Sequence, residues 1–292
     1  MIIFIIIPVH NRIRFTRECL ESLNQQDSRQ FRVIVVDDGS IDGTSDMISK
    51  EFPETILLNG DGNLWWIGAV NKGIRHALNL SNPEDLILLL NDDLIVRRNY
   101  ISSMIDAAQS NPGAIIGSVE TTMTSPEIIK NGGIQVNWST AKRKVLNPGR
   151  QLDEFPQGYT IEVSKLTGRG TLFPLRVFRD LGLYDEAHFR HCGDPELPLR
   201  AKFKAGYTLL VNYDAVVISR VAEKKNINTK EHYTLSDWKE YFFGIRSHFN
   251  IMDHYWLARN SAPNYFWFIR YFSLEIVRII GHYFLRLKIL HT

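Results

Sequence analysis

Cysteine, long apolar runs and an excess of one charge are all scarce in this sequence of 292 residues. The two cysteines, Cys19 and Cys192, form neither a disulfide framework nor a Cys-x-x-Cys pair, which indicates a reducing compartment. No stretch reaches the roughly 20 apolar residues of a transmembrane helix. With 34 basic and 32 acidic residues, the net charge of +2 is too balanced for the basic surface of a nucleic-acid-binding protein. We therefore expect a cytoplasmic protein that does not bind nucleic acid.

The segment after the first apolar run lacks the glycines of two common nucleotide-binding loops. We expect the run that ends at Pro8 to be a buried strand, because no basic residues precede it and it is short for a signal peptide. The residues that follow, Val9-His10-Asn11-Arg12, contain no Gly-x-Gly-x-x-Gly motif of dinucleotide-binding oxidoreductases. They also lack the glycine-rich, lysine-containing loop of sugar nucleotidyltransferases. Both enzyme classes are therefore weakened as interpretations.

The chain does contain an alternation of short β-branched runs and amphipathic segments of helical length. Apolar residues make up 44% of the sequence, which is enough for a sizeable core. The expected strands are Ile2–Pro8, Arg32–Val36, Thr55–Leu58, Leu86–Leu90 and Ala114–Val119. The expected helices are Arg14–Asn24, Thr44–Glu51, Gly68–Leu80 and Asn99–Gln109. This alternation predicts an α/β fold with a mostly parallel, Rossmann-like sheet and helices on both of its faces.

The pattern weakens after residue 120. We interpret 121–160 as a long insertion with one hairpin, and the aromatic tail Asp237–Leu290 as helical. Between them we expect helices near Pro174–Leu181 and Glu196–Ala205 and a strand at Thr208–Ile218. The chain is thus expected to divide into an α/β unit over 1–220, with halves 1–120 and 121–220, and a helical C-terminal region over 221–292.

Three acidic groups stand where strands end or where a loop leads into a helix. Asp37-Asp38 and Asn91-Asp92-Asp93 each follow an apolar strand, and Asp194-Pro195-Glu196 precedes a helix. Each group alone is typical of a turn or a helix N-cap. Two acidic pairs at neighbouring strand ends repel each other unless a partner neutralises them, so together they favour a site for a metal and a nucleotide. The third group offers a general base.

The motifs around these carboxylates resemble those of family 2 glycosyltransferases, inverting enzymes of the GT-A fold, and the loop with Trp65 and Trp66 resembles that of rhamnosyl- and galactosyltransferase-type members. The resemblance covers about residues 2–220 in the family's order. Its motifs are Ile6–Arg12, Val35–Thr44, Gly62–Ile74, Leu89–Asp93, Thr167–Phe173, Gly182–Glu186 and Gly193–Ala201. It implies transfer of a sugar from a nucleotide-diphosphate donor, of UDP or dTDP type, to a hydroxyl of a surface polysaccharide or a lipid-linked glycan.

The resemblance also implies a role for individual residues. Asp194 would be the general base, and Asp93 would bind Mg²⁺ or Mn²⁺. The implied donor-nucleotide residues are Pro8, His10, Arg12, Asp38, Asn63, Asn71 and Asp92. The implied sugar- and acceptor-binding residues are Trp65, Trp66, Arg169, Gly170, His191 and Glu196. A non-catalytic nucleotide- or glycan-binding subunit of the same fold is the alternative.

Two departures from the family pattern concern the metal. Asn91 stands where many relatives have a carboxylate, and Ser219-Arg220 stands where many have a histidine. The cation would then depend on donor diphosphate oxygens, or Arg220 or a lysine would contact the diphosphate. Whether Trp65 and Trp66 stack on a sugar or pack against the sheet stays open at this point. A zinc site at His188, His191 and Cys192 is disfavoured because no further soft ligands have suitable spacing.

The tail from 263 to 292 combines aromatic and basic residues at helical spacing. Its repeating apolar positions are Phe268, Phe272, Ile276, Ile279, Tyr283, Leu287 and Leu290. This pattern is typical of an amphipathic helix in a membrane interface, which here would be the inner face of the plasma membrane. The same pattern also suits a helix packed on the catalytic domain or on a second subunit of a homodimer.

Overall fold

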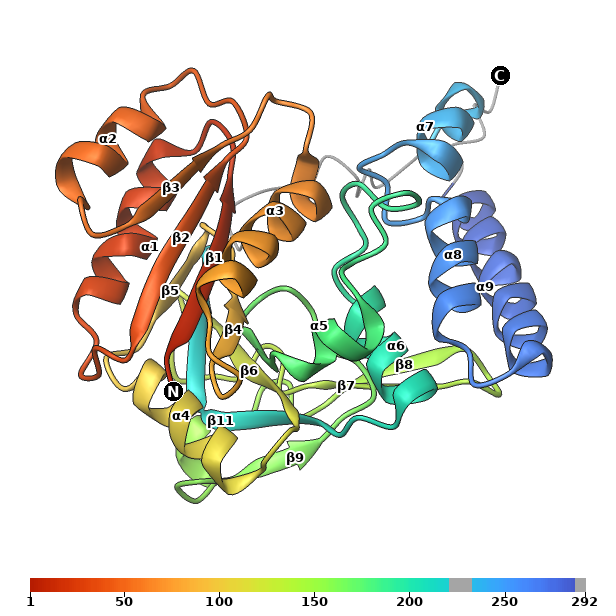
Figure 1. Cartoon of the computed structure of the whole chain (residues 1–292). Coiled ribbons are helices and arrows are strands. Elements are labelled where there is room, and N and C mark those ends of the chain that lie inside the picture. Colours follow the sequence, from red (N-terminus) through yellow and green to blue (C-terminus); the bar gives the residue numbers. More distant parts are fainter. Residues whose placement is uncertain (221–232, 287–292) are drawn as a thin grey trace.

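A computed structural model describes residues 1–220 and 233–286. Within these residues, nine strands form one sheet in the order β3-β2-β1-β4-β10-β6-β11-β5, and β9 pairs with β11 (Figure 1). The strands are β1 (Ile3–Val9), β2 (Phe31–Asp37), β3 (Ile56–Asn59), β4 (Leu86–Leu89), β5 (Leu94–Val96), β6 (Ile115–Thr122), β9 (Thr160–Glu162), β10 (Thr171–Pro174) and β11 (Leu209–Ser219). The sheet supports the α/β prediction.

Both faces of the sheet are buried because side chains alternate along each strand. In β1, Ile3, Ile5 and Ile7 belong to one apolar cluster, and Phe4 and Ile6 belong to the cluster on the other face. Helices α1 (Ile13–Asn24), α2 (Thr44–Glu51) and α4 (Tyr100–Ser110) cover the first face. Helices α3 (Trp65–Leu80), α5 (Arg176–Leu181) and α6 (Glu196–Ala205) cover the second. Each fully buried isoleucine contributes about 1.5–3 kcal/mol, so β1 is a central element of the core.

The direction of the strands decides where polar side chains gather. Strands β2, β1 and β4 are parallel, as are β6 and β11, whereas β10 runs antiparallel to both β4 and β6. Val9, Asp37, Leu89 and Ser219 therefore end their strands at the same edge of the sheet. Because β10 is reversed, its first residue, Thr171, lies at that edge too. Loops from five strands meet there.

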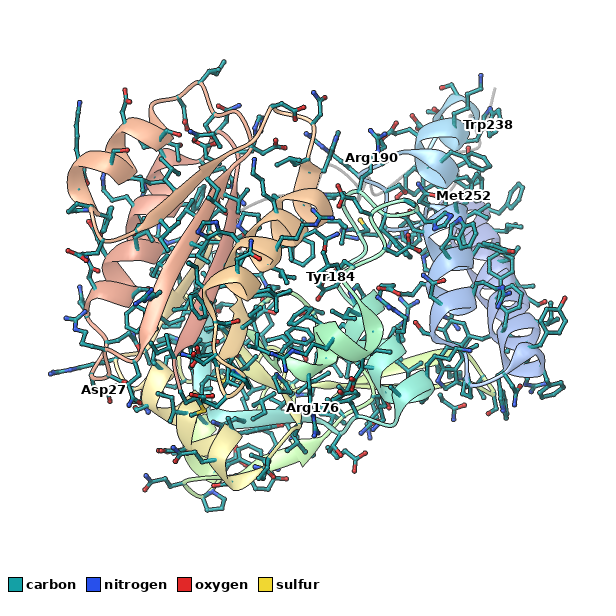
Figure 2. All side chains as sticks on the ribbon, viewed as in Figure 1. Asp27, Arg176, Tyr184, Arg190, Trp238 and Met252 are labelled. Atoms are coloured by element: carbon teal, nitrogen blue, oxygen red, sulfur yellow. The ribbon has the colours of Figure 1, made fainter. Side chains whose placement is uncertain are left out.

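The insertion and the C-terminal helices pack together beside the sheet, at the right of Figure 1. The insertion contains the expected hairpin, β7 (Ile134–Asn137) and β8 (Lys142–Val145), and a short 3₁₀ turn at Leu152–Glu154. After a 3₁₀ turn at Leu235–Asp237 come α7 (Trp238–Phe243), α8 (Ile251–Ser261) and α9 (Tyr265–Leu285). Exposed Trp238 and Met252 belong to α7 and α8 (Figure 2). No helix of the described residues is long and apolar enough to cross a membrane.

A buried glutamate joins the hairpin to the C-terminal helices. Glu275 of α9 lies 3.3 Å from a guanidinium nitrogen of Arg143 on β8, 2.7 Å from Arg278 and 3.3 Å from the imidazole of His254 on α8. Burial alone would raise the pKa of Glu275, but His254 and the two arginines outweigh burial and lower the pKa to about 2. The carboxylate is therefore charged at neutral pH and links three elements.

The structure refines two expectations from the sequence. Strands β5, β9 and β10, each of three or four residues, were not expected from the sequence. In the tail, Phe268, Ile279 and Tyr283 of the predicted apolar face are buried within the protein. Leu287 and Leu290 of that face lie outside the described residues.

Candidate active site

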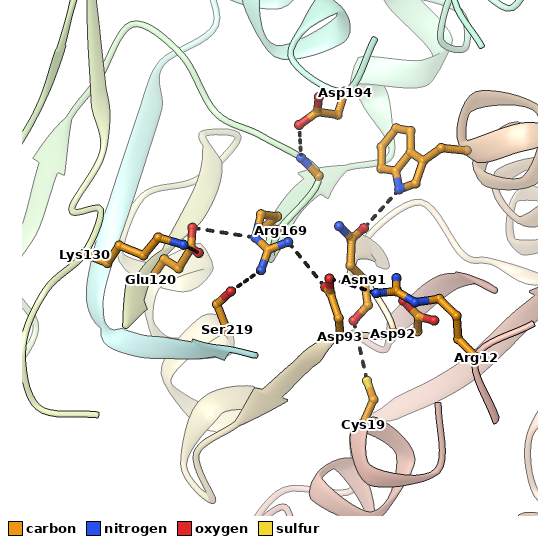
Figure 3. A network of polar contacts seen from close by, with 12 residues as sticks. Arg12, Cys19, Asn91, Asp92, Asp93, Glu120, Lys130, Arg169, Asp194 and Ser219 are labelled. Atoms are coloured by element: carbon orange, nitrogen blue, oxygen red, sulfur yellow. Dashed lines mark hydrogen bonds and ion pairs between the residues drawn. The ribbon is translucent and has the colours of Figure 1, made fainter. Parts of the chain in front are cut away.

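Carboxylates from β4 and an arginine from the β1–α1 loop meet at the carboxyl edge of the sheet. Because β1 and β4 are neighbours, Arg12 lies directly across from the residues that follow β4. Its guanidinium donates to Asp92 Oδ1 at 2.7 Å and to Asp93 Oδ2 at 3.3 Å (Figure 3). Both aspartates are buried. The structure thus brings Arg12 together with these two acids, while the donor-nucleotide role of Arg12 and Asp92 and the metal role of Asp93 stay predictions.

A second arginine approaches Asp93 from the loop before β10. Arg169 Nη1 lies 3.3 Å from Asp93 Oδ1, Nη2 donates to Ser219 Oγ at 2.8 Å, and Nε lies 3.6 Å from Glu120. Glu120 also accepts from Lys130 at 2.7 Å. Asp93 therefore lies between two guanidinium groups (Figure 3). Positive charge from two separate loops surrounds the predicted metal ligand.

Gly170 allows the turn that carries Arg169 to lie close to the sheet. Its φ of +82° lies in the region that favours glycine, and an added Cβ would be 2.4 Å from Ser118 Oγ and 2.7 Å from Tyr100 Oη. Any side chain at this position would displace the turn from the sheet. The predicted importance of Gly170 therefore has a structural explanation, namely the close approach of this turn to β6 and α4.

The buried carboxylate of Asp38 holds the loop that precedes α3. Asp38 accepts from the backbone N–H groups of Gly62 and Trp65, each at 2.9 Å. Its own carbonyl accepts from the His10 ring at 2.5 Å. Trp65, with φ of +56°, adopts a conformation that non-glycine residues seldom take, and the Asp38 bond helps to hold it. The contact of Asp38 with a nucleobase stays a prediction.

The two tryptophans have different environments. The sequence left open whether they stack on a sugar or pack against the sheet. Trp66 Nε1 donates to Asn91 Oδ1 at 3.0 Å, and its ring packs edge-on against Tyr184. Trp65 instead lies edge-on to His191, with ring centroids 6.3 Å apart, and the Arg246 guanidinium is 5.6 Å from its centroid. Trp66 is a packing residue in the wall of the site, whereas Trp65 lies among polar side chains.

Asp194 lies at the start of α6, next to the loop that contains Arg169. Its Oδ2 accepts from the backbone N–H of Gly168 at 3.0 Å. Gly168 is close-packed, since an added Cβ would be 2.2 Å from the Trp66 ring. Among the described residues, the other oxygen, Oδ1, has no hydrogen-bond partner. One oxygen is thus fixed by the backbone and the other is available to a substrate.

Two other predicted residues have their polar atoms engaged within the protein. Glu196 is fully buried and bonds to Arg200 at 2.7 and 3.2 Å and to Asn260 of α8 at 3.2 Å. Burial raises the pKa of Glu196, and Arg200 opposes the rise. The Asn71 amide donates to Tyr184 O at 3.0 Å and to Glu186 at 3.1 Å. These bonds position α8 and the Tyr184 loop, and direct substrate contacts of both residues stay predictions.

The C-terminal region adds residues near Asp194 that were not expected from the sequence. His248 Nδ1 lies 3.8 Å from the Cys192 sulfur, and Arg246 reaches Trp65 as described above. The pKa of His191 is lowered by desolvation, with Arg246 and His248 adding to the effect and Asp194 opposing it. Arg246 and His248 are more than 50 positions from Asp194 in the sequence, so no local motif could have indicated them.

Lys165 is another basic residue near Asp194 that the sequence did not indicate. Burial and the neighbouring Arg143 lower the pKa of Lys165 to about 8, and Asp194 opposes the fall. Its ammonium group is therefore close enough to the predicted base to interact with it. The lysine lies just before the Thr167–Phe173 motif, but nothing in its local sequence distinguishes it from a surface lysine.

The remaining predicted residues and features lie as follows. Pro8 is partly buried near the end of β1, and Asn63 is exposed in the loop before α3.

Among the described residues, no three His, Cys, Asp or Glu side chains are grouped to hold a metal. A cavity of about 510 Å³, lined by residues such as Arg176, Asp180 and Tyr207, lies at the amino ends of β6 and β11. It contains none of the acidic groups discussed above.

Comparisons with known proteins identify the family of the chain and the proteins that share its fold. The model of the family "Glycosyl transferase family 2" matches residues 4–155. The N-acetylglucosaminyl-diphospho-decaprenol L-rhamnosyltransferase of Mycobacterium tuberculosis is 26% identical, over 77% of this chain and 78% of that protein. The low-salt glycan biosynthesis hexosyltransferase Agl10 of Haloferax volcanii is also 26% identical, over 64% of this chain and 58% of that protein.

Solved structures with similar folds are more distant in sequence. TarS 1–349 of S. aureus in complex with UDP-GlcNAc has a TM-score of 0.61 at 14% identity, covering 96% of this chain and 73% of that one. GalNAc-T7 with UDP, GalNAc and Mn²⁺ has a TM-score of 0.62 at 14% identity, covering 97% and 58%. These two likenesses show the fold alone. Because the family model spans more than half of the residues, the chain belongs to glycosyl transferase family 2 and is a glycosyltransferase with a GT-A fold.

Proposed function

We propose that the protein is an inverting glycosyltransferase that uses a UDP- or dTDP-sugar donor and Asp194 as general base. The observation that carries the proposal is the environment of Asp194, whose Oδ2 is fixed by Gly168 N–H while Oδ1 is uncommitted among the described residues. A base needs this combination of fixed position and a free lone pair. The proposed acceptor is a hydroxyl of a surface polysaccharide or lipid-linked glycan, because the similar mycobacterial protein is named for a lipid-diphosphate-linked sugar.

The transfer would be a single displacement. Asp194 takes the proton of the acceptor hydroxyl, and the hydroxyl oxygen forms a bond to the anomeric carbon. The bond from that carbon to the diphosphate oxygen breaks on the opposite side, so the electron pair leaves with the nucleoside diphosphate and the configuration inverts. Arg12 and Arg169 lie beside Asp93, where their charges would stabilise the departing diphosphate.

The residues around Asp93 fit Mg²⁺ or Mn²⁺ held chiefly by the donor. Asp93 offers a hard carboxylate, and both arginine contacts to it, at 3.3 Å, are longer than usual charge-assisted hydrogen bonds. The Asn91 amide oxygen already accepts from Trp66, so we do not count it as a ligand. Two proteins with similar folds, the mannosyltransferase PcManGT of Pyrobaculum calidifontis and GalNAc-T7, have structures that contain Mn²⁺. When bound, such a cation would neutralise charge on the leaving diphosphate.

The acceptor side of the proposed site includes the C-terminal region. Arg246, His248 and Lys165 place basic groups close to His191 and Asp194. We assign these groups to an acidic part of the acceptor, such as the diphosphate that links a sugar to its lipid. The division into a catalytic unit over 1–220 and an acceptor-binding helical region over 221–292 is part of the same proposal.

The test pairs an activity assay with nucleotide binding. Asp194→Asn keeps the size of the side chain and removes its basicity, so transfer should fall by about 10²–10⁴-fold. Thermal-shift titration with UDP, dTDP, GDP and CDP, each with and without Mn²⁺, should give the same shifts for the variant and the wild type. A variant that transfers sugar at the wild-type rate would remove Asp194 as the base. Nucleotide binding without transfer by the wild type would favour the binding-subunit alternative.

A further inference from the structure

Helix α9 carries a stripe of large apolar side chains on its solvent face. Phe266, Ile269, Val277, Ile280 and Phe284 are 64%, 45%, 70%, 38% and 62% exposed. Their separations of three, eight, three and four residues keep them on one side of a helix with 3.6 residues per turn. Scattered exposed apolar residues are ordinary, but five on one side of a 21-residue helix, interrupted at Ser273, indicate a binding surface.

The stripe is not the face by which α9 packs on the rest of the protein. That role belongs to the opposite side of the helix, where Phe268, Tyr271, Glu275, Ile279 and Tyr283 are buried. Phe268 and Tyr271 pack with Ala141 of the hairpin, and Ile279 and Tyr283 pack with Tyr241 of α7. The helix is therefore held from one side, and its second apolar face remains outside.

The charges beside the stripe are basic. Within the described part of α9 and its C-cap, the arginines Arg270, Arg278 and Arg286 are exposed, whereas the acidic residue Glu275 is buried against Arg143, Arg278 and His254. The asymmetry extends to the whole region. The described residues 233–286 contain six basic and four acidic residues, whereas residues 1–220 contain 24 and 26, so the part of the chain that carries the stripe has the more positive charge balance.

We propose that this stripe, defined by Phe266, Ile269, Val277, Ile280 and Phe284, docks α9 on the surface of an anionic lipid bilayer. Apolar side chains would enter the boundary between headgroups and acyl chains, while the arginines contact phosphate groups. A second copy of the chain suits the surface less well, because each α9 would present the same basic edge and no exposed acidic residue to pair with it. The inference goes beyond the proposed transfer reaction and does not depend on the donor or on Asp194.

The experiment is co-sedimentation of the full chain with vesicles of phosphatidylglycerol and phosphatidylcholine, compared with vesicles of phosphatidylcholine alone. We expect binding to the mixed vesicles, weaker binding to the neutral ones and further weakening in high salt. The triple variant Phe266→Ser, Val277→Ser, Phe284→Ser should bind the mixed vesicles at least roughly tenfold more weakly, since about half of the buried apolar area would be lost. All three side chains are exposed, so the melting temperature should stay close to that of the wild type.

A matched control removes three exposed apolar side chains elsewhere on the molecule. Ile41→Ser, Met123→Ser, Ile128→Ser changes residues of the α/β unit that are also exposed, and it should leave vesicle binding unchanged. The inference would be overturned if the wild type failed to bind the mixed vesicles, or if both triple variants bound equally well. It would also be overturned if light scattering showed a dimer that only the α9 variant dissociates, without vesicle binding. The thermal shift caused by the nucleotide that the wild type binds should be the same in the wild type and the α9 variant, whose changed residues lie outside the donor motifs, and this separates the test from that of the catalytic proposal.

Discussion

Replacing the buried Glu275 by glutamine should loosen the C-terminal helices from the insertion hairpin. The substitution keeps the shape of the side chain but removes the charge that faces Arg143, Arg278 and His254. The pKa of Glu275 is lowered from 4.5 to about 2. A difference of about 2.5 units corresponds to roughly 3 kcal/mol of stability, which agrees with the roughly 3–5 kcal/mol lost when one partner of a buried pair is removed.

The pH dependence has a definite sign. Because the folded-state pKa is lowered, the contribution of Glu275 is fully present above about pH 4.5 and is lost as the pH falls towards 2. The wild type should therefore lose stability over this window, and Glu275→Gln should lose less over the same window. At neutral pH the variant should already be about 3 kcal/mol less stable.

Urea denaturation at pH 7 and at about pH 2.5, followed by circular dichroism, measures both effects. Glu127→Gln is the control, because Glu127 is 65% exposed and its ion pair with Arg97 should be worth at most about 1 kcal/mol. The expected loss of unfolding free energy is about 3 kcal/mol. The proposed charge balance would be refuted if the unfolding free energy of Glu275→Gln were within about 0.5 kcal/mol of that of the wild type. If α7–α9 unfold as a separate unit, the variant should show a second, earlier transition.

Two predictions concern the site itself. Arg169→Met should lower kcat by about 10²–10³-fold, as expected when one preorganised donor of a charge-stabilising site is removed, and it should weaken UDP or dTDP binding in isothermal titration. An unchanged kcat would show that Arg169 serves only to pack the loop before β10. Arg246→Ala should raise the KM for a lipid-diphosphate acceptor and leave kcat and the KM for a neutral sugar acceptor nearly unchanged. Equal effects on both acceptors in steady-state assays would contradict the assigned role of Arg246.

Much of the sheet could be predicted from the sequence because its strands are buried on both faces. Runs such as Ile3–Val9 and Phe31–Asp37 are nearly continuous in apolar residues, which is typical of parallel strands between two layers of helices. The acidic groups that follow these strands could also be predicted to lie together, because parallel strands end at one edge of the sheet. Strand β10 could not be predicted, because its four residues follow the glycine-containing turn 168–170 and lie outside the alternation of strands and helices in the first 120 residues.

The site was predicted less completely, and the reason is distance along the chain. The partners of Glu196 and Asn71 include Asn260 and Tyr184, which lie 64 and 113 residues away. No local pattern tells whether a polar side chain will face a substrate or such a partner. The tail was read as one amphipathic helix for the same reason. The sequence shows the apolar positions but does not show which of them α7, α8 and the hairpin will cover.

The reversed strand β10 separates two tasks that the chain performs on either side of it. Hydrogen bonds to β4 and β6 fix its register, so the turn with Gly168, Arg169 and Gly170 keeps its place whatever precedes it. The 123–165 segment can therefore lengthen, shorten or change its shape without moving Arg169, the arginine proposed to stabilise the leaving diphosphate. Under the proposed mechanism, a fold built in this way would allow evolution to exchange the insertion as a unit, while the residues proposed for transfer are inherited unchanged.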